Sequence, residues 1–562
     1  MYLRESKQKR SDGSVITHFQ IAESVWDSAR KRSETKILCN VGRVEDALAI
    51  ERLRKLARGI LRRCAPEDLA EGGVGWKVVD SWPHGDVYVL DVLWRRLGIP
   101  EALAEVLGAR KHEFSVERAL FAMVANRCCA PASKLYCYEQ WLREDVRLAG
   151  AADLALHHLY RAMDVLIDSK DAIEKGVFFR ASSLLNLEVD LVFYDTTSLH
   201  FEVDAEDPSP VPPTEATPPT ESSAPASGLR QRGNSKNGRY DAPQIVVGLA
   251  VTRDGLPVRH WVFPGNTVDV TTVRQVRDDL RGWQLSRTVF VGDAGMVSEA
   301  NLAHLTKGGG RFILCVPMRR GDTVTTEVMT RPGRYRAVAD RLRVKEVIVG
   351  EGERRRRYVV AHNPDEERRQ RLHREQLLAE LEAELATLQP DRGTTHSKRV
   401  CDLRTSERFG RYLRVGRGER LEIDRAKVRA DAHFDGKFVV HSNDDSLSPE
   451  DMALAYKQLM RVEQCWRTLK SGLKMRPVYH RLEHRIRAHV ALAVLGLLLE
   501  RVAERACDDT WRNIRDHLRQ IKLVQLKAPE GTLWQVTEPQ PAAAKRLKSL
   551  GIDNPPPIAS IG

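Results

Sequence analysis

The sequence predicts a multi-domain α+β protein built around a mixed sheet with flanking helices. Its 562 residues are more than one hydrophobic core usually holds together. Helical periodicity runs from about residue 88 to 185, whereas apolar strand-like runs alternate with amphipathic helices over 186–317. Residues 318–435 break this pattern, and strand and helix character returns after them. We therefore expect a helical N-terminal region and a central sheet that an inserted domain interrupts.

The composition is that of a globular protein with a basic charge balance. Apolar residues make up 42% and charged residues 30%, and 89 Lys and Arg against 77 Asp and Glu give a net charge of +12. This surplus favours a polyanionic partner, nucleic acid first, although it can also serve only to keep the surface soluble. The cysteines form no CxxC pair and no cysteine–histidine set with zinc spacing, which argues against a zinc-finger protein.

We find no secretion or membrane signal in the sequence. The first residues lack the apolar segment of a signal peptide. The longest apolar run, 490–499, is far shorter than the roughly 20 residues that a membrane span needs. We therefore expect a cytoplasmic protein without a membrane partner.

The first 185 residues divide into two parts that could both contact DNA. Residues 1–63 alternate polar and apolar positions and then take a helical pattern over 47–63, which predicts a small antiparallel sheet followed by a helix. The basic side chains of this segment could bind phosphates or could simply protect a sheet edge. Residues 64–185 have helical periodicity with Gly and Pro breaks and are predicted to be a helical DNA-binding region.

Residues 186–317 are predicted to form the first part of the central sheet. The order of elements is strand, strand, strand, helix, strand, helix, strand, and a turn at 253–255 makes a hairpin of the second and third strands. A run rich in Pro, Ser, Thr and Glu follows the first strand, and it predicts a disordered insert over 204–230. The strands are expected over 187–202, 245–252, 256–265, 288–295 and 311–317, and the helices over 270–282 and 298–306.

The rest of the chain is predicted to hold the inserted domain, the second part of the core and a tail. The inserted domain, 318–435, contains a helix over 365–388 whose leucines recur every three or four residues and mark one buried or pairing face. Residues 436–506 start with a strand, continue with a capped helix and end with a very apolar helix over 481–506. Residues 507–562 are assigned to a C-terminal tail.

The capped helix includes a stretch, YKQLMRVEQCWRTLK (456–470), with a stripe of polar side chains. Tyr456, Glu463 and Lys470 stand seven residues apart, so one continuous helix would place all three on one face. An acid, a cation and a phenol in line suit a face that meets a charged ligand, but they also fit a solvated helix face. Trp466 fits a core position better than a base-stacking platform.

Two aspartates elsewhere could be partners of this stripe. Asp195 ends the first predicted strand and Asp293 ends the fourth, so that with Glu463 they make three carboxylates on two strand ends and a helix. Hard divalent cations prefer oxygen ligands, and a pair of Mg²⁺ ions can stabilise both the attacking and the leaving oxygen of a phosphoryl transfer. Taken singly, each aspartate could be an ordinary strand-end cap.

These residues and their surroundings resemble the DDE transposases of bacterial insertion sequences. The resemblance rests on YDTTSLHFE, VGLAVTRDGLPVRHWVFPGNTVD, VGDAGMVSEANLAHL and the set of Tyr456, Glu463 and Lys470. It covers 185–505 well and extends more loosely to both ends. The similar branch carries a Tyr–Arg–Glu–Lys signature on the last catalytic helix. It implies a ribonuclease H-like core, with a domain inserted between the second Asp and the Glu.

The resemblance also implies roles for individual residues. Asp195, Asp293 and Glu463 would be catalytic and would bind two Mg²⁺ ions, with Mn²⁺ as an alternative metal. Tyr456 and Lys470 would hold phosphates of the DNA ends.

The sequence departs from the signature at one position, where Leu459 stands in place of the Arg. The nearest cation after it is Arg461, which points about 200° further round a helix of 3.6 residues per turn. Arg467, one turn after the predicted catalytic glutamate, is a candidate substitute. Asn266, Thr267 and Asp269 could line the site or lead DNA strands past it, or could simply cap the helix that follows them.

The function that the resemblance implies is DNA transposition. The enzyme would cleave insertion-sequence ends and join the 3′-hydroxyl to target DNA by two-metal in-line phosphoryl transfer. Its partners would be double-stranded DNA, as terminal inverted repeats and target, and a second copy of the chain in the DNA complex, within the bacterial cytoplasm near the nucleoid. The alternative is a DNA-binding nuclease or regulator derived from a transposase, without strand transfer.

Overall fold

The computed structural model describes most of the chain. The described residues are 1–11, 14–28, 30–61, 76–108, 112–187, 189–208, 228–236, 238–285, 287–318, 327–388, 398–416, 420–528 and 531–559. The predicted disordered insert lies outside the described residues from 209 to 227. The chain divides into two compact units, Met1–Ser81 with Val524–Gln535, and Trp82–Leu523 with Val536–Gly562.

The first unit contains the predicted N-terminal sheet and helix. Three antiparallel strands, β1 (Tyr2–Lys9), β2 (Val15–Asp27) and β3 (Arg32–Arg43), precede helix α1 (Ala47–Leu61). The alternating pattern therefore predicted the element types correctly. Strands β4 (Lys77–Pro83), β16 (Lys522–Ala528) and β17 (Gly531–Val536) pair in a second sheet.

The second unit begins with helices, as the periodicity predicted. Helix α5 is the most deeply buried of them, and the Ser115 side chain caps its N-terminus by accepting from the Arg118 N–H. It packs against α7 and against the apolar helix α16 (Glu483–Cys507). The helices before the central sheet are α3 (Gly85–Arg96), α4 (Ile99–Leu107), α5 (Val116–Cys129), α6 (Lys134–Tyr136), the π-helical η1 (Cys137–Asp145), α7 (Leu156–Asp168) and α8 (Lys170–Leu184).

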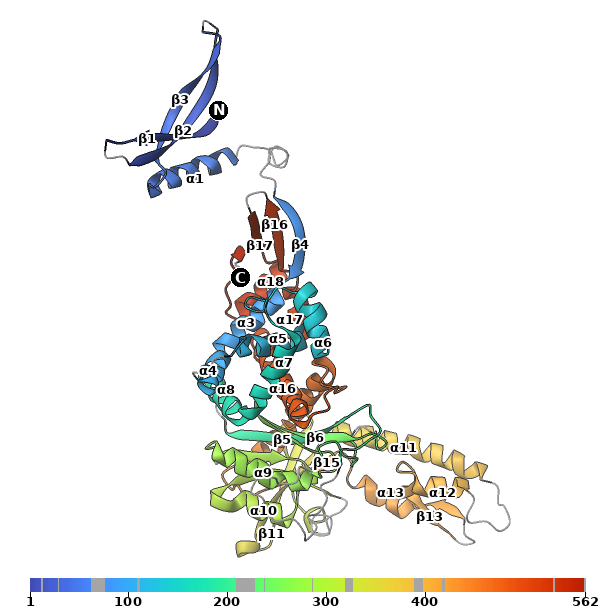
Figure 1. The fold of residues 1–562 in the computed structure, drawn as a ribbon. Helices are drawn as coiled ribbons and strands as arrows, with labels where there is room; N and C mark the ends of the chain where they lie inside the picture. The colour runs from blue at the N-terminus through green and yellow to red at the C-terminus, as the bar shows by residue number, and fades with distance from the viewer. Residues whose placement is uncertain are drawn as a thin grey trace, which may run out of the picture. The chain divides into compact units, whose positions relative to one another are not determined.

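A nine-stranded mixed sheet lies at the centre of the second unit (Figure 1). Its first strands are β5 (Leu191–His200), β6 (Gln244–Val251), β7 (Pro257–Pro264), β8 (Val289–Gly292) and β9 (Arg311–Val316). Strands β5, β6 and β7 are an antiparallel meander, and β8 and β9 run parallel to β5. The order β7-β6-β5-β8-β9 is that of a ribonuclease H-like sheet, which confirms the predicted core.

Helices cover both faces of this sheet, so most residues of its central strands are buried. Helices α9 (Asp269–Gly282) and α10 (Glu299–Thr306) pack on one face, and α16 lies on the other (Figure 1). Every residue of β6 is buried. The main apolar cluster joins β5 to α9 through Val192, Tyr194 and Val276. Neighbouring side chains of β5 point to the opposite face, and Asp195 is one of them.

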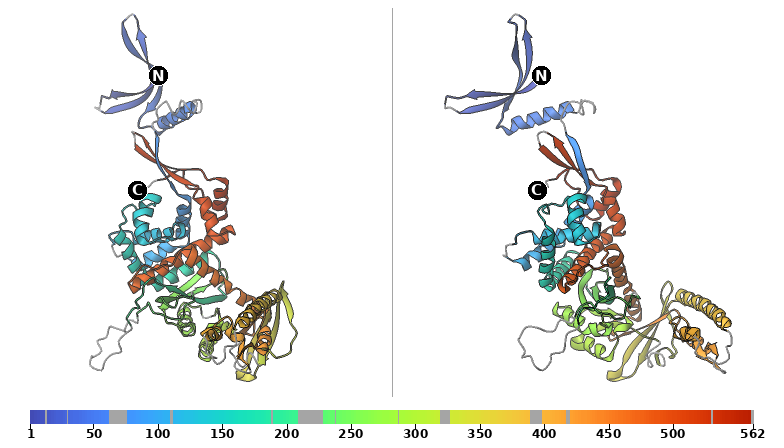
Figure 2. Two further views of the ribbon diagram at one scale, coloured as in Figure 1. Left: turned by 90° about the vertical axis from the view of Figure 1, so that its right-hand side faces the viewer. Right: turned by 45° about the vertical axis from the view of Figure 1, so that its right-hand side comes forward.

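The region predicted as an inserted domain has two parts. Strands β10 (Arg336–Ala339), β11 (Leu342–Val349) and β12 (Arg356–His362) extend the central sheet beyond β15 (Lys437–Ser442). A small lobe with its own leucine-rich cluster follows β12 (Figure 2). The predicted leucine face of its long helix is buried there. The lobe comprises α11 (Pro364–Thr387), α12 (Lys398–Thr405), α13 (Arg425–Ala432) and the hairpin β13 (Leu413–Val415) and β14 (Leu421–Ile423).

The predicted long helix around Glu463 is broken into three pieces: α14 (Pro449–Lys457), α15 (Met460–Arg467) and the π-helical η8 (Thr468–Gly472). At the junction, the Leu459 N–H donates to the Tyr456 carbonyl and the Arg461 N–H to the Gln458 carbonyl, both three residues back. Such tighter turns change the helical phase. The expectation that Tyr456, Glu463 and Lys470 share one stripe of a continuous helix is therefore wrong.

Residues 507–562, assigned from sequence to a tail, contain regular structure. Helix α17 (Trp511–Leu518) is followed by β16 and β17, α18 (Pro541–Ser549) and the short β18 (Ile558–Ala559). Trp511 is buried and donates its indole N–H to the Cys128 carbonyl of α5. Among the described residues, no helix has the length and apolarity needed to cross a membrane.

Candidate catalytic site

The parallel pairing of β5 with β8 brings Asp195 and Asp293 together. Leu191 pairs with Val289 and Phe193 with Val291. Continuing this register by two residues places Asp195 beside Asp293, which directly follows the end of β8. Neighbouring strands lie about 4.8 Å apart, so the two carboxylates belong to one site.

Two neighbours from different segments contact the Asp195 carboxylate. The buried Trp466 of α15 donates its indole N–H to Oδ2 at 3.2 Å, and the Lys236 ammonium lies 3.8 Å from Oδ1. Burial raises the pKa of Asp195 to about 6, against the opposing effect of Lys236, and the negative charges of Asp269 and Asp293 raise it further. A divalent cation bound by Asp195 would favour the ionised form of its carboxylate.

Asp293 is held by a tyrosine of the preceding helix, α14. The Tyr456 hydroxyl donates to Asp293 Oδ1 at 3.1 Å, and its ring lies 5.2 Å from that of Phe438. Burial, together with the nearby Cys315 and Asp293, raises the pKa of Tyr456, so the phenol stays protonated and can donate.

Glu463 lies on α15, between Tyr456 and Trp466 in the sequence, and its side chain is exposed. It stands one turn before Trp466, the residue that contacts Asp195. Across the described ranges, no three His, Cys, Asp or Glu side chains are grouped closely enough to hold a metal ion. The structure therefore brings Asp195 and Asp293 together but does not bring Glu463 into contact with them.

A cluster of Lys236, Thr196 and Asp269 adjoins Asp195. Lys236 forms a 2.8 Å ion pair with Asp269, and the Thr196 hydroxyl donates to the same carboxylate. Asp269 is the first residue of α9 and makes no helix-capping bond, so of its two sequence interpretations the structure favours lining the site. The sequence reasoning missed Lys236; the only signal was a polar stretch, NSKNGRYDAPQ, just before β6.

The predicted DNA-binding residues have different environments. Lys470 is half-buried, and burial, with the nearby cations Arg476 and Lys236, lowers its pKa to about 8, while Asp195 acts in the opposite direction. Arg461 and Arg467 are exposed on α15, and Arg461 donates to Gln464. Asn266 is exposed before α9 and does not cap it, because the N-cap position belongs to Val268.

The donor set suits a hard divalent cation. Asp195 and Asp293 present carboxylate oxygens from neighbouring parallel strands, and the described cysteines are unpaired thiols outside any metal-binding group. Mg²⁺ and Mn²⁺ prefer such oxygen ligands. The two aspartates therefore fit the metal that the resemblance implies, with Glu463 as the third carboxylate on the nearby helix.

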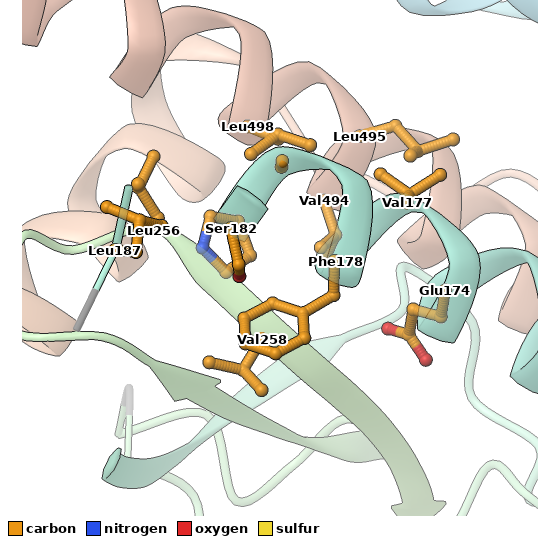
Figure 3. A pocket seen from close by; sticks show the side chains of 12 residues that line it. Glu174, Val177, Phe178, Ser182, Leu187, Leu256, Val258, Val494, Leu495 and Leu498 are labelled. Atoms are coloured by element: carbon orange, nitrogen blue, oxygen red, sulfur yellow. The ribbon is translucent and has the colours of Figure 1, made fainter. Parts of the chain in front are cut away.

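An apolar pocket lies away from these carboxylates (Figure 3). It is formed by α8, the start of β7 and α16, with Phe178, Val258 and Leu498 among its walls. Glu174 is its one acidic lining residue, and its carboxylate is bound by Lys170 and by the His260 backbone N–H. None of the predicted catalytic or DNA-binding residues lines this pocket.

Comparisons with known proteins point to the transposases. A family model described as "Transposase DDE domain" matches residues 216–499, which include Asp293 and Glu463. A second model, "IS1634 family transposase, N-terminal domain", matches residues 3–71. A search of curated proteins finds no match. Among solved structures, a cryo-EM structure of the piggyBac transposase synaptic complex with hairpin DNA is similar at 8% identity and a TM-score of 0.33, covering 78% of this chain and 79% of that chain.

Proposed function

The chain belongs to the DDE transposases of insertion sequences, and from this premise we propose that it cleaves the DNA ends of its element and joins the 3′-hydroxyl to target DNA. Both steps are in-line attacks on a phosphodiester, so one site can perform them. The observation that carries the proposal is the parallel register that sets Asp195 beside Asp293 at the centre of a ribonuclease H-like sheet.

In this proposal Asp195, Asp293 and Glu463 hold two divalent cations, Mg²⁺ or Mn²⁺. When bound, these ions lower the pKa of the attacking water or 3′-hydroxyl and stabilise the leaving oxygen. Trp466 and Tyr456 orient the two aspartates through single hydrogen bonds. Glu463 completes the set by a side-chain movement from its exposed position on α15.

The proposed substrate is double-stranded DNA, first as terminal inverted repeats and then as target. Lys470 lies close enough to Asp195 to feel its charge, so a phosphate bound there would sit next to the reacting atoms. Arg467, Arg461 and Asn266 are exposed and would contact flanking DNA, whereas the hydroxyl of Tyr456 is engaged by Asp293. We infer a homodimer across two ends, acting in the cytoplasm.

The test is end cleavage by an Asp293→Asn variant of the full chain. Asparagine keeps the size of the side chain but removes the charge that a divalent cation needs. Mg²⁺-dependent cleavage should be abolished, while binding to the ends stays within several-fold of the wild type. Asp340→Asn, in an exposed turn between β10 and β11, is the matched control and should cleave normally.

A second assay separates transposition from simple nuclease action. The wild-type chain is given pre-cut ends with free 3′-hydroxyls together with a target plasmid. Joined products are expected. Normal cleavage by Asp293→Asn would refute the assignment of the site, and cleavage without joining would indicate a nuclease.

A further inference from the structure

The ammonium group of Lys236 is fully committed to the protein. Its Nζ lies 2.7 Å from Thr196 Oγ1, 2.9 Å from the Thr196 carbonyl oxygen and 2.8 Å from Asp269 Oδ2. A lysine ammonium has three protons to donate, and these three acceptors use all of them. Lys236 therefore has no proton left for a DNA phosphate, although its side chain is 38% exposed.

Asp269 is bound to the protein through both of its carboxylate oxygens. Its Oδ1 accepts from the Thr196 hydroxyl, and its Oδ2 pairs with Lys236. This carboxylate lies close to both predicted catalytic aspartates. Thr196 directly follows Asp195 in β5, and a Cβ added at Gly295, two residues after Asp293, would lie 3.4 Å from Asp269 Oδ2. A third aspartate thus stands at the site, with each of its oxygens in contact with a protein donor.

The same lysine also acts on Asp195. Its Nζ is 3.8 Å from Asp195 Oδ1, which is longer than its 2.8 Å contact with Asp269 Oδ2 but still close enough for attraction. One cation therefore sits between two acids. It neutralises one of them and offsets part of the charge of the other.

We propose that Lys236 is a positioning residue that keeps Asp269 out of the set of metal ligands. Its fixed charge beside Asp195 would repel a divalent cation held by Asp195 and Asp293 and would lower the affinity of that site. This inference rests on the proposed function, since it takes Asp195 and Asp293 as the metal ligands. Asp269 holds the lysine in place, and the Thr196 hydroxyl links the two.

The experiment measures Mn²⁺ binding to the full chain without DNA, by the electron paramagnetic resonance signal of the free ion. Lys236→Met should tighten binding about tenfold, because a positive charge beside the site is removed. Lys236→Arg keeps the charge and should stay within about threefold of the wild type. Lys457→Met, on the exposed part of α14, is the matched control and should change nothing.

The pairing of Lys236 with Asp269 is tested in the other direction. Asp269→Asn should weaken Mn²⁺ binding about tenfold, because Lys236 is released to pair with Asp195. In the Lys236→Met/Asp269→Asn double variant both charges are gone, and affinity should return to within about threefold of the wild type. A double variant that binds Mn²⁺ as weakly as Asp269→Asn would show that the charge of Lys236 does not lower the affinity of the site, and the proposal would be overturned.

Two further results keep the proposal separate from the function on which it rests. Circular dichroism of each variant confirms that it is folded before its affinity is compared. Asp195→Asn should abolish Mn²⁺ binding at the site. Unchanged binding in Asp195→Asn would overturn the proposed metal site itself, whereas a loss there combined with unchanged affinity in Lys236→Met would overturn only the role of Lys236.

Discussion

Trp466 donates its indole N–H to Asp195 Oδ2 across 3.2 Å, and this contact joins helix α15 to the central strand β5. An indole N–H can only donate, so Oδ2 of Asp195 is the acceptor in this hydrogen bond. The tryptophan is buried, which limits its movement. The rotamer of Asp195 is therefore set from the helix that also carries Glu463.

Replacing Trp466 by Phe should keep most of the packing and remove this hydrogen bond. We expect end cleavage to fall about tenfold and the free energy of unfolding to fall by about 1 kcal/mol, the usual net value of one hydrogen bond. Trp511→Phe is a matched control, because Trp511 donates to the Cys128 carbonyl in the helical region. It should lose similar stability and cleave normally; equal loss of cleavage in both variants would contradict a specific role for Trp466.

Replacing Tyr456 by Phe tests the second orienting contact. The ring keeps its place beside Phe438, but Asp293 Oδ1 loses its donor. Cleavage should fall about tenfold, while the affinity for DNA ends stays within about twofold, because the hydroxyl is engaged by Asp293. The measurement is single-turnover cleavage together with a binding titration. A smaller salt dependence of binding in this variant would instead identify Tyr456 as a phosphate contact.

Lys470→Ala should weaken binding to DNA ends and reduce its salt dependence by about one phosphate contact. The measurement is the slope of log affinity against log salt concentration. Lys457→Ala, on α14, is the control for removing one exposed lysine. An unchanged slope in Lys470→Ala would show that Lys470 does not contact DNA. A smaller slope in Arg467→Ala alone would show that Arg467 of α15 makes the phosphate contact.

Glu174 should make the stability of the second unit depend on pH. Burial opposes its ionisation, but His260 and Lys170 outweigh burial and lower the pKa of Glu174 to about 2, with Lys170 Nζ 2.6 Å and the His260 N–H 2.9 Å from its oxygens. A depressed carboxylate pKa stabilises the fold above the unfolded value near 4.5, and this stability is lost as pH falls through 2.

Glu174→Gln should therefore unfold more easily than the wild type by about 3 kcal/mol at pH 7 and by only about 1 kcal/mol at pH 3. Urea denaturation at the two pH values measures the difference. A gap of the same size at both would show that the glutamine acts through packing and not through the lost charge.

The strand before Asp293 was predictable because it is a continuous apolar run that ends next to an acid. The prediction that Asp195 ends its strand is wrong, because β5 continues past Asp195 to His200. Burial on both faces favours such apolar runs, and the parallel register of β5 and β8 sets the two aspartates side by side. The helices flanking the sheet were predictable from periodicity for the same reason. The sequence could therefore predict the first two carboxylates of the candidate site and the order of the core strands.

The break at Gln458 and Leu459 was not predictable, because neither residue disfavours a helix. It arises where α14 packs against the sheet extended by β11 and β12 while α15 packs against β5 and β6. Lys236 was hidden for a different reason. Its segment has no periodicity, and its partners Thr196 and Asp269 are distant in sequence. Only the folded chain brings these three together.

Asp207 and Arg230 lie on either side of the 209–227 segment in the sequence, and they contact each other. Arg230 pairs with Asp207 through its guanidinium, and the Arg230 N–H donates to Asp207 Oδ2 at 2.8 Å. The Asp207 N–H donates in turn to the Arg230 carbonyl. The two ends of a fluorescent protein or an affinity tag inserted between these two residues would be attached close together, so the insertion should not displace Lys236. A reporter for DNA binding can therefore be inserted between Asp207 and Arg230.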